Sequence, residues 1–287
     1  MQALGYYIAL PLLYLISMLP FPVLYLVSDF FYYLNYYVIG YRKKVVRDNL
    51  EKCFPEKTNQ EITVIEKQFF RNLTDLIFET LKGISISKSD TLKIATFEGR
   101  EILEKYKANN QNIIITGGHC GNYEFINLFL SASPDFPLTV KAVYRKLSNP
   151  YFEKLFYSFR TKFGTKMYPT SNAYKAMAEQ EEHRPFAFFF VNDQFAAPDK
   201  AFYTTYLGRK TGFFQGHEIF ARKYDLPVYY LHITKTGRGK FDLSLKEICT
   251  NPDEVPQNEI IERHVRLLEK NILEDIPNWL WSHRRWK

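Results

Sequence analysis

The stretch NIIITGGHCGNYEF, residues 112–125, decides how the chain is organised. Its first five residues form an apolar, β-branched run, which predicts a strand buried on both faces. The glycines that follow, Gly117 and Gly118, predict a sharp exit from that strand, with a helix soon after. His119 and Glu124 therefore lie just beyond the end of a buried strand, where polar side chains are often functional.

Strand-like and helix-like segments alternate along the rest of the chain. Apolar and aromatic runs predict further strands at 138–145, 185–193, 227–237 and 240–248. The last of these can pair with its predecessor as a hairpin. Helical spacing predicts helices at 59–83, from about 122, and at 150–164, 171–182, 214–225 and 258–275. This alternation predicts an α/β domain with a mostly parallel central sheet flanked by helices.

Three polar clusters follow predicted strands directly. They are the His119 block, Tyr144-Arg145 and Asn192-Asp193. Because the ligand crevice of an open α/β sheet lies at the carboxyl ends of its strands, we expect these clusters to converge.

The spacing of His119 and Glu124 restricts how they can meet. Inside one helix, five residues would place them about 140° apart, on different faces. If His119 stays in the turn and the helix begins after Gly121, Glu124 can accept the proton of one imidazole nitrogen and leave the other as a general base. First-turn amides then offer an oxyanion or phosphate site. The alternative is a surface loop with an incidental histidine, which the strand-Gly-Gly-His context disfavours.

Other chemistries have weaker support. His217-Glu218 lacks the second histidine of a zinc motif, and there is no dinucleotide fingerprint or P-loop. Cys120 is a poor thiol nucleophile for His119, because adjacent residues on a turn point apart. The three cysteines match no zinc or redox spacing, so we expect reduced thiols and a reducing compartment.

The N-terminus carries no charged side chain from Met1 to Ser28. That is longer than the roughly 20 apolar residues a bilayer span needs, and it lacks the basic start and cleavage site of a signal peptide. Prolines within the run leave open a kinked span or a helix dipping into one leaflet. An aromatic belt and the basic Arg42, Lys43 and Lys44 follow, as in an interface anchor with a cytoplasmic flank.

We therefore expect residues 1–41 to be a membrane-anchoring helical segment and 42–287 to form the α/β domain. The alternative is a buried N-terminal helical hairpin of a soluble protein. The net charge of +7 suits an anionic partner, and 17% of the residues are aromatic. Nucleic acid is not expected, because the aromatics cluster in the apolar N-terminus and the strands rather than on a base-stacking platform.

The chain resembles the late acyltransferases of lipid A biosynthesis, of the lauroyl and myristoyl type, within the glycerolphosphate acyltransferase-like superfamily. HCGNYE carries that superfamily's histidine, four residues, then an acidic residue. VYRKLSNP, residues 143–150, is similar to the family's YRP…NP block, with Lys146 in place of proline. VNDQ, residues 191–194, is similar to its DQ/DH block, and PNWLWSHRRWK to its Trp-rich basic end. The resemblance extends over nearly the whole chain.

The resemblance implies a glycerolphosphate acyltransferase-like fold at the bacterial inner membrane, with the site facing the cytoplasm. The donor is an acyl carrier protein thioester, and the acceptor is a hydroxyl of a phosphorylated glycolipid, a lipid A precursor. His119 removes the hydroxyl proton, Glu124 orients His119, and no metal or organic cofactor is required. The residues expected to contact substrate are Gly121, Asn122, Arg145, Asn149, Arg160, Asp193, Gln194 and Arg222.

Two other functions stay open. Lys146 and the compact length leave room for a different acceptor, such as an aminoacyl membrane lipid. A catalytically dead, membrane-bound scaffold is the alternative from another class, against which the intact His119 and Glu124 argue.

Overall fold

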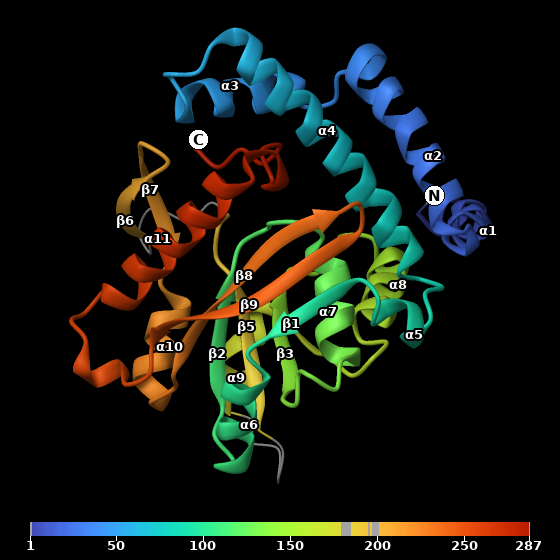
Figure 1. The fold of residues 1–287 in the computed structure, drawn as a ribbon. Coiled ribbons are helices and arrows are strands. Elements are labelled where there is room, and N and C mark those ends of the chain that lie inside the picture. The colour runs from blue at the N-terminus through green and yellow to red at the C-terminus, as the bar shows by residue number, and fades with distance from the viewer. Residues whose placement is uncertain (1, 179–184, 195, 197–200, 287) are drawn as a thin grey trace.

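The computed structural model describes residues 2–178, 185–194, 196 and 201–286 (Figure 1). Within them, seven strands form one sheet in the order β1-β9-β8-β2-β5-β3-β4. All neighbouring pairs are parallel except β8 and β9, which form the expected hairpin. The predicted α/β fold with a mostly parallel central sheet flanked by helices is confirmed.

The long strands agree with the sequence prediction. They are β2 (Ile113–Gly117), β3 (Thr139–Tyr144), β5 (Phe186–Val191), β8 (Val228–Gly237) and β9 (Lys240–Cys249). The prediction missed two four-residue edge strands, β1 (Ala95–Glu98) and β4 (Lys166–Pro169), which are too short for a periodic signal. It also missed a separate hairpin of β6 (Ala201–Tyr206) and β7 (Arg209–Phe214). That hairpin turns through Leu207 and Gly208, both at positive φ, and leucine is an unusual residue there.

The helices also follow the predicted spacing. The segments expected at 59–83, 122, 150–164, 214–225 and 258–275 are α4 (Asn59–Lys82), α7 (Tyr123–Ala132), α8 (Pro150–Arg160), α10 (Gly216–Tyr224) and α11 (Glu259–Glu274). Unpredicted helices are α3 (Lys43–Cys53), α5 (Lys88–Thr91) and α6 (Arg100–Ala108). The helix expected at 171–182 is α9 (Ala173–Ala178), and 179–182 lie outside the described residues.

The core lies on the two faces of the sheet. All five residues of β2 are buried, so both of its faces are covered. α10 and α11 contact β2, while α7 contacts β3. The buried side chains of α11 recur at three and four residues, as a helix on a sheet requires: Ile260, Ile261, Val265, Leu268 and Ile272.

The apolar N-terminal run forms two helices, α1 (Gln2–Met18) and α2 (Phe21–Tyr33), which separate at Pro20. Both pack against α4 at one end of the molecule (Figure 1). A buried hydrogen bond from Ser28 to Asp75, at 2.6 Å, joins α2 to α4. Within the described part of the chain, none of the helices combines the length and the hydropathy that a membrane span needs.

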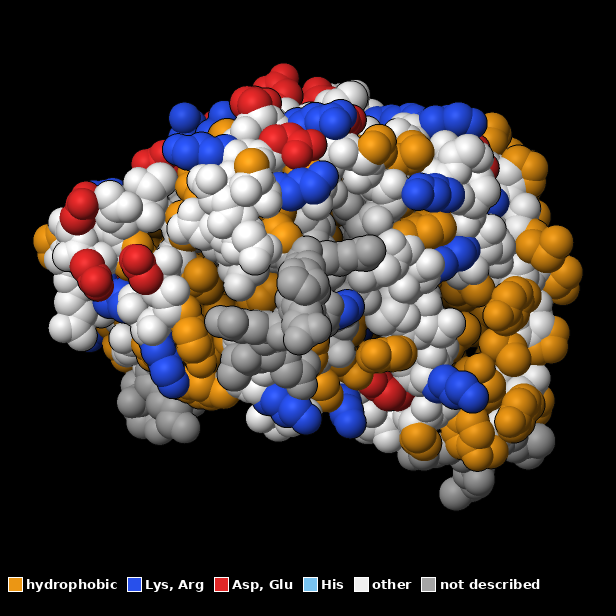
Figure 2. Space-filling view, turned by 90° about the horizontal axis from the view of Figure 1, so that it is seen from below, with side chains coloured by type: hydrophobic (Ala, Val, Ile, Leu, Met, Phe, Trp, Pro, Cys, Tyr) orange, Lys and Arg blue, Asp and Glu red, His pale blue; other side chains and the backbone are white. Residues whose placement is uncertain are grey.

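Many apolar side chains of this N-terminal region point to solvent, where Figure 2 shows them gathered at one end of the molecule. We call this set the apolar patch. It consists of Tyr7, Ile8, Leu12, Tyr14, Leu15, Met18, Val23, Leu26, Phe30, Phe31, Tyr33, Tyr37, Val38, Ile39 and Tyr41. The last four residues belong to or follow a π-helical turn, Leu34–Ile39.

Candidate active site

The loop between β2 and α7 holds His119 in a confined position. A Cβ atom on Gly118 would lie 2.4 Å from the buried Leu268 side chain and 3.2 Å from an oxygen of Asp193, so a larger residue there would have to displace these side chains. Gly121 has a φ of +60°, in the left-handed region, and faces Phe241. The sharp exit that the two-glycine pattern predicts is therefore present, although Gly118 and Gly121, rather than Gly117, carry the constraint.

The carboxylate that orients His119 is Asp193. Its Oδ1 lies 2.5 Å from Nδ1 of His119, and its Oδ2 accepts the backbone N–H of His119 at 2.6 Å. The register of the sheet brings them together: Gly117 of β2 pairs with Val191 of β5, so the residues two positions beyond each strand are neighbours. Asp193 was expected to contact substrate, but the structure gives it this different place.

Trp279 completes the surroundings of Asp193. Its indole Nε1–H donates to Oδ2 at 2.8 Å, so the buried carboxylate accepts three hydrogen bonds. Burial alone would raise the pKa of Asp193. The charge and hydrogen bonds of His119 and the bond from Trp279 outweigh burial and hold that pKa well below its usual range. Asp193 is thus ionised, and the sequence reasoning did not foresee Trp279 here.

Glu124 does not orient His119, and that prediction is wrong. Its carboxylate is bound by the guanidinium of Arg160 from the end of α8, with Nε–H donating at 3.0 and 3.1 Å and Nη2 at 2.5 Å from Oε1. The cause is geometric, since Glu124 lies in the first turn of α7 and is directed at α8 rather than back at the loop. It still acts on His119 through its charge, which helps to raise the histidine's pKa.

The other nitrogen of His119 faces Gln194. The side-chain Nε2 of Gln194 lies 3.2 Å from Nε2 of His119. Because Nδ1–H is directed at Asp193, Nε2 has the lone pair and the glutamine amide donates to it. Tyr123 packs edge-on against the imidazole, with ring centres 4.7 Å apart. Among the residues that the structure describes, the nitrogen able to accept a proton is therefore hydrogen-bonded by a neutral amide alone.

Two residues expected to contact substrate are used by the fold instead. The amide of Gly121 donates to the carbonyl of Asn278 at 3.0 Å, so it is not free to hold an oxyanion. Asn122 is buried: its oxygen accepts the N–H of Phe125 at the start of α7, and its amide donates to Glu79 at 2.9 Å. Gly121 and Asn122 therefore shape the loop beside His119 rather than a ligand-binding surface.

Three other residues that were predicted to contact substrate lie on other elements of the fold. Asn149 caps α8, accepting the amide of Tyr151 at 3.0 Å. Arg222 pairs with Glu218 at 2.9 Å and donates to carbonyls at 252–256, which ties α10 to the loop before α11. Arg145 is exposed after β3, with no hydrogen bond or ion pair to any described residue. Asn149 and Arg222 therefore serve the fold rather than a ligand.

A narrow cavity lies beside His119. It has a volume of about 20 Å³, room for about one water molecule. Its walls are apolar side chains of α4 and of the segment 277–280, with Lys235, Asp75 and Glu79 among the polar lining. Within the described residues no cluster of side chains suits a metal ion.

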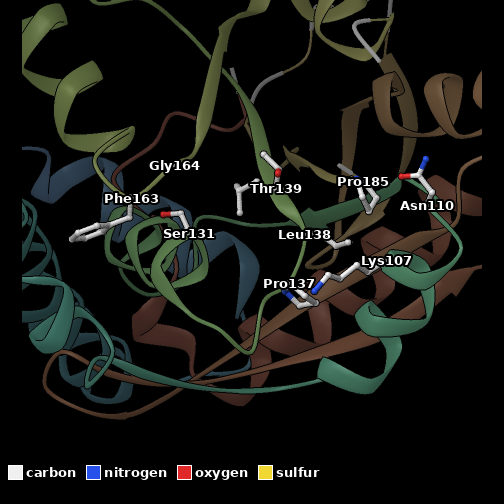
Figure 3. Close-up of a pocket in the computed structure, with 10 residues that line it drawn as sticks. Lys107, Asn110, Ser131, Pro137, Leu138, Thr139, Phe163, Gly164 and Pro185 are labelled. Atoms are coloured by element: carbon white, nitrogen blue, oxygen red, sulfur yellow. The ribbon is translucent and has the colours of Figure 1, made fainter. Parts of the chain in front are cut away.

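A larger cavity, of about 740 Å³, opens at the other end of the sheet (Figure 3). Lys107 and Asn110, before β2, and Leu138 and Thr139, at the start of β3, border it. These residues lie at the amino ends of β2 and β3, whereas His119 follows the carboxyl end of β2. The cavity is therefore separate from the His119–Asp193 pair.

The three cysteines are buried and free. Burial raises the pKa of the Cys120 thiol well above its ordinary value, and the charge of Asp193 adds to that rise. A thiolate beside His119 is accordingly disfavoured, as the turn geometry predicted.

Comparison with known proteins identifies the family of the chain. The sequence model of the bacterial lipid A biosynthesis acyltransferases matches residues 1–287. A lipid A biosynthesis acyltransferase of Haemophilus influenzae is 23% identical over 237 residues, which cover 79% of this chain and 73% of the relative. The lipid A biosynthesis palmitoleoyltransferase of Escherichia coli is 24% identical over 293 residues, covering 97% and 89%. The chain therefore belongs to the bacterial lipid A biosynthesis acyltransferase family.

Proposed function

We propose that this protein transfers a fatty acyl chain from an acyl carrier protein thioester to a hydroxyl of a lipid A precursor, with His119 as the general base. The observation that carries the proposal is the His119–Asp193 pair, in which Nδ1 of His119 contacts Asp193 and Nε2 of His119 accepts from the neutral amide of Gln194. Membership of the family supports acyl transfer in lipid A synthesis. No metal or organic cofactor is needed for this chemistry.

In the proposed reaction, the acceptor hydroxyl replaces the amide of Gln194 at Nε2 of His119 and gives up its proton there. The hydroxyl oxygen attacks the thioester carbonyl carbon, forming a tetrahedral intermediate. The carbon–sulfur bond then breaks, and His119 returns the proton to the leaving thiolate. The products are the ester and the free carrier thiol. Asp193 stabilises the imidazolium that forms between these steps.

The oxyanion needs a donor other than the amide of Gly121. We assign this role to the Gln194 side chain, which lies at hydrogen-bond distance from His119 and becomes free once the hydroxyl displaces it. The exposed guanidinium of Arg145 is our candidate for an acceptor phosphate, because bidentate pairing suits that group. Arg160 has its charge matched by Glu124, so we assign it to the framework of α7 and α8.

The apolar patch suggests how the protein reaches a lipid acceptor. Exposed contiguous apolar surface of this extent marks a lipid or protein contact, and Arg42, Lys43 and Lys44 follow it in the chain. We propose that α1, α2 and the π-helical turn lie on the cytoplasmic face of the bacterial inner membrane. The acyl carrier protein, an acidic partner, then approaches a chain of net charge +7 from the cytoplasm.

A double substitution tests this membrane contact. Leu26→Ser/Ile39→Ser is expected to weaken binding to sedimented vesicles of zwitterionic and anionic phospholipid by about 10²-fold, because each buried aliphatic side chain contributes about 1.5 kcal/mol. The matched control is Ile219→Ser/Leu273→Ser, two exposed apolar residues on α10 and α11, far from α1 and α2 in Figure 1. Equal binding by both variants would remove the patch from the lipid contact.

The pH dependence of the rate follows from the charge of the histidine. Burial lowers the pKa of His119, but the charge and hydrogen bond of Asp193 and the charge of Glu124 raise it above its ordinary value of 6.5. Only the neutral ring can accept a proton, so kcat/KM should rise with pH through a value above 6.5. Asp193→Asn should move this limb toward lower pH. A limb below 6.5 in the unmodified protein would contradict the assignment.

The proposed function is tested by acyl transfer with detergent-solubilised protein, followed by mass spectrometry. The donors are a panel of acyl carrier protein thioesters, and the acceptor is the tetra-acylated, bis-phosphorylated disaccharide precursor. A gain of one acyl chain, absent with His119→Ala, is the expected result. Thioester hydrolysis that depends on His119, with no gain on this acceptor, would direct the search to another membrane lipid. No His119-dependent reaction of any thioester would overturn the proposal.

A further inference from the structure

A second buried carboxylate lies beneath the His119 loop. Glu79, in α4, is 3% exposed. Its Oε2 accepts the side-chain amide of Asn122 and its Oε1 accepts the hydroxyl of Tyr25, both at 2.9 Å. Among the described residues, no cation forms an ion pair with it. A buried carboxylate held only by neutral donors is costly, so its place in the fold requires an explanation.

Asn122 connects this carboxylate to the catalytic loop. Its side-chain oxygen accepts the N–H of Phe125 at 3.1 Å and so caps the start of α7. Asn122 lies three residues after His119 in the chain. On the other side, the loop is held by the segment around Asn278 and Trp279, which bonds to Gly121 and bridges Cys120. Glu79 therefore supports the loop at Asn122, while the segment around Asn278 and Trp279 supports it at Cys120 and Gly121.

Tyr25 connects the same carboxylate to the N-terminal helices. It belongs to α2, and its ring lies under the guanidinium of Arg238, 4.4 Å from the ring centre. Gly239 closes the space around the pair: a Cβ atom there would lie 2.2 Å from the Tyr25 hydroxyl and 3.2 Å from Oε1 of Glu79. Its φ of +66° is one that glycine adopts without strain. The Tyr25–Glu79 contact thus has little freedom.

We propose that Glu79 is a positioning residue for His119, acting through Asn122, and that α2 holds Glu79 in place through Tyr25. The N-terminal helices would then belong to the framework of the active site as well as to the proposed membrane contact. Glu79 borders the same narrow cavity as His119, but no hydrogen bond joins the two among the described residues, so it acts through the loop. The inference rests on the proposed function of His119.

An exchange of the two partners tests the pair. Asn122→Asp replaces the amide that donates to Glu79 with a second acid, beside a carboxyl whose pKa is raised by burial. It should lower kcat about 10²-fold, because displacement of a catalytic group by about 1 Å has that effect. Adding Glu79→Gln restores the contact with donor and acceptor reversed. The amide of the new glutamine donates to the new carboxylate at position 122, whose other oxygen still accepts the N–H of Phe125. Turnover should return to within about tenfold of the unmodified protein.

A second pair of variants tests whether α2 holds Glu79 in place. Tyr25→Phe removes only the hydroxyl that holds Glu79 and should lower kcat several-fold with KM unchanged. Tyr203→Phe, its matched control, removes the hydroxyl of an exposed tyrosine on β6, outside the apolar patch, and should leave kcat as it is. Equal rates for both variants would exclude α2 from the framework.

A chemical probe separates this inference from the proposed function. Diethyl pyrocarbonate modifies neutral imidazole, and peptide mass spectrometry follows the modification rate of His119 without any acyl transfer. The modification rate of His119 in Asn122→Asp should differ from that in the unmodified protein. In the Asn122→Asp/Glu79→Gln variant it should return to the rate of the unmodified protein. If the unmodified protein transfers no acyl chain, the proposed function fails while this pattern still tests the positioning. A folded double variant as impaired as Asn122→Asp in both measurements would overturn the inference.

Discussion

Replacing Asp193 with asparagine should lower kcat by about 10³- to 10⁴-fold, nearly as far as His119→Ala, while the protein stays folded. The carboxylate accepts three N–H groups, from the ring and backbone of His119 and from the indole of Trp279. A carboxamide has one acceptor oxygen, so its NH₂ group must face at least one of these donors. The imidazole would lose both its orientation and the negative charge that stabilises its protonated form.

The matched control for this prediction is Glu124→Gln, which changes an acidic residue of the same site by the same chemistry. Its effect on kcat should be at least tenfold smaller, because Glu124 acts on His119 only through its charge. Steady-state kinetics with the acyl carrier protein thioester distinguish the two, with circular dichroism as the measure of folding. A larger loss in Glu124→Gln than in Asp193→Asn would restore Glu124 as the partner of His119.

The same Glu124→Gln change should act mainly on stability. It leaves the guanidinium of Arg160, whose side chain is only 18% exposed, without its carboxylate. Breaking such a pair costs about 3 kcal/mol of the free energy of unfolding, which lowers Tm by about 6–12 °C in a chain of this size. Thermal unfolding followed by circular dichroism measures the shift.

A double-mutant cycle shows whether the pair itself is the cause. Glu124→Gln/Arg160→Met removes both charges and should recover most of the lost Tm, because a methionine needs no counter-charge. Independent, additive losses from Glu124→Gln and Arg160→Met would mean that the two side chains stabilise the fold through other contacts.

Several features could be predicted from the sequence because their causes are local. The composition of the β-branched run before Gly117 favours a buried strand, and the three- and four-residue spacing of α4 and α11 appears directly in the order of residues. His119 could be placed at the carboxyl end of β2 for the same reason. Short edge strands such as β1 and β4 carry no such pattern, since neighbouring strands rather than local spacing stabilise them.

The partner of His119 was decided by the tertiary structure alone. Glu124 is close in sequence, but the first turn of α7 directs it to Arg160, from a helix that begins 26 residues later. Asp193 is 74 residues away and becomes adjacent through the parallel register of β2 and β5. Strand register depends on how whole faces of the sheet pack, which no local pattern encodes. The sequence by itself thus determined the fold class and the place of His119 at the end of β2, and the packing of the sheet chose the carboxylate that contacts it.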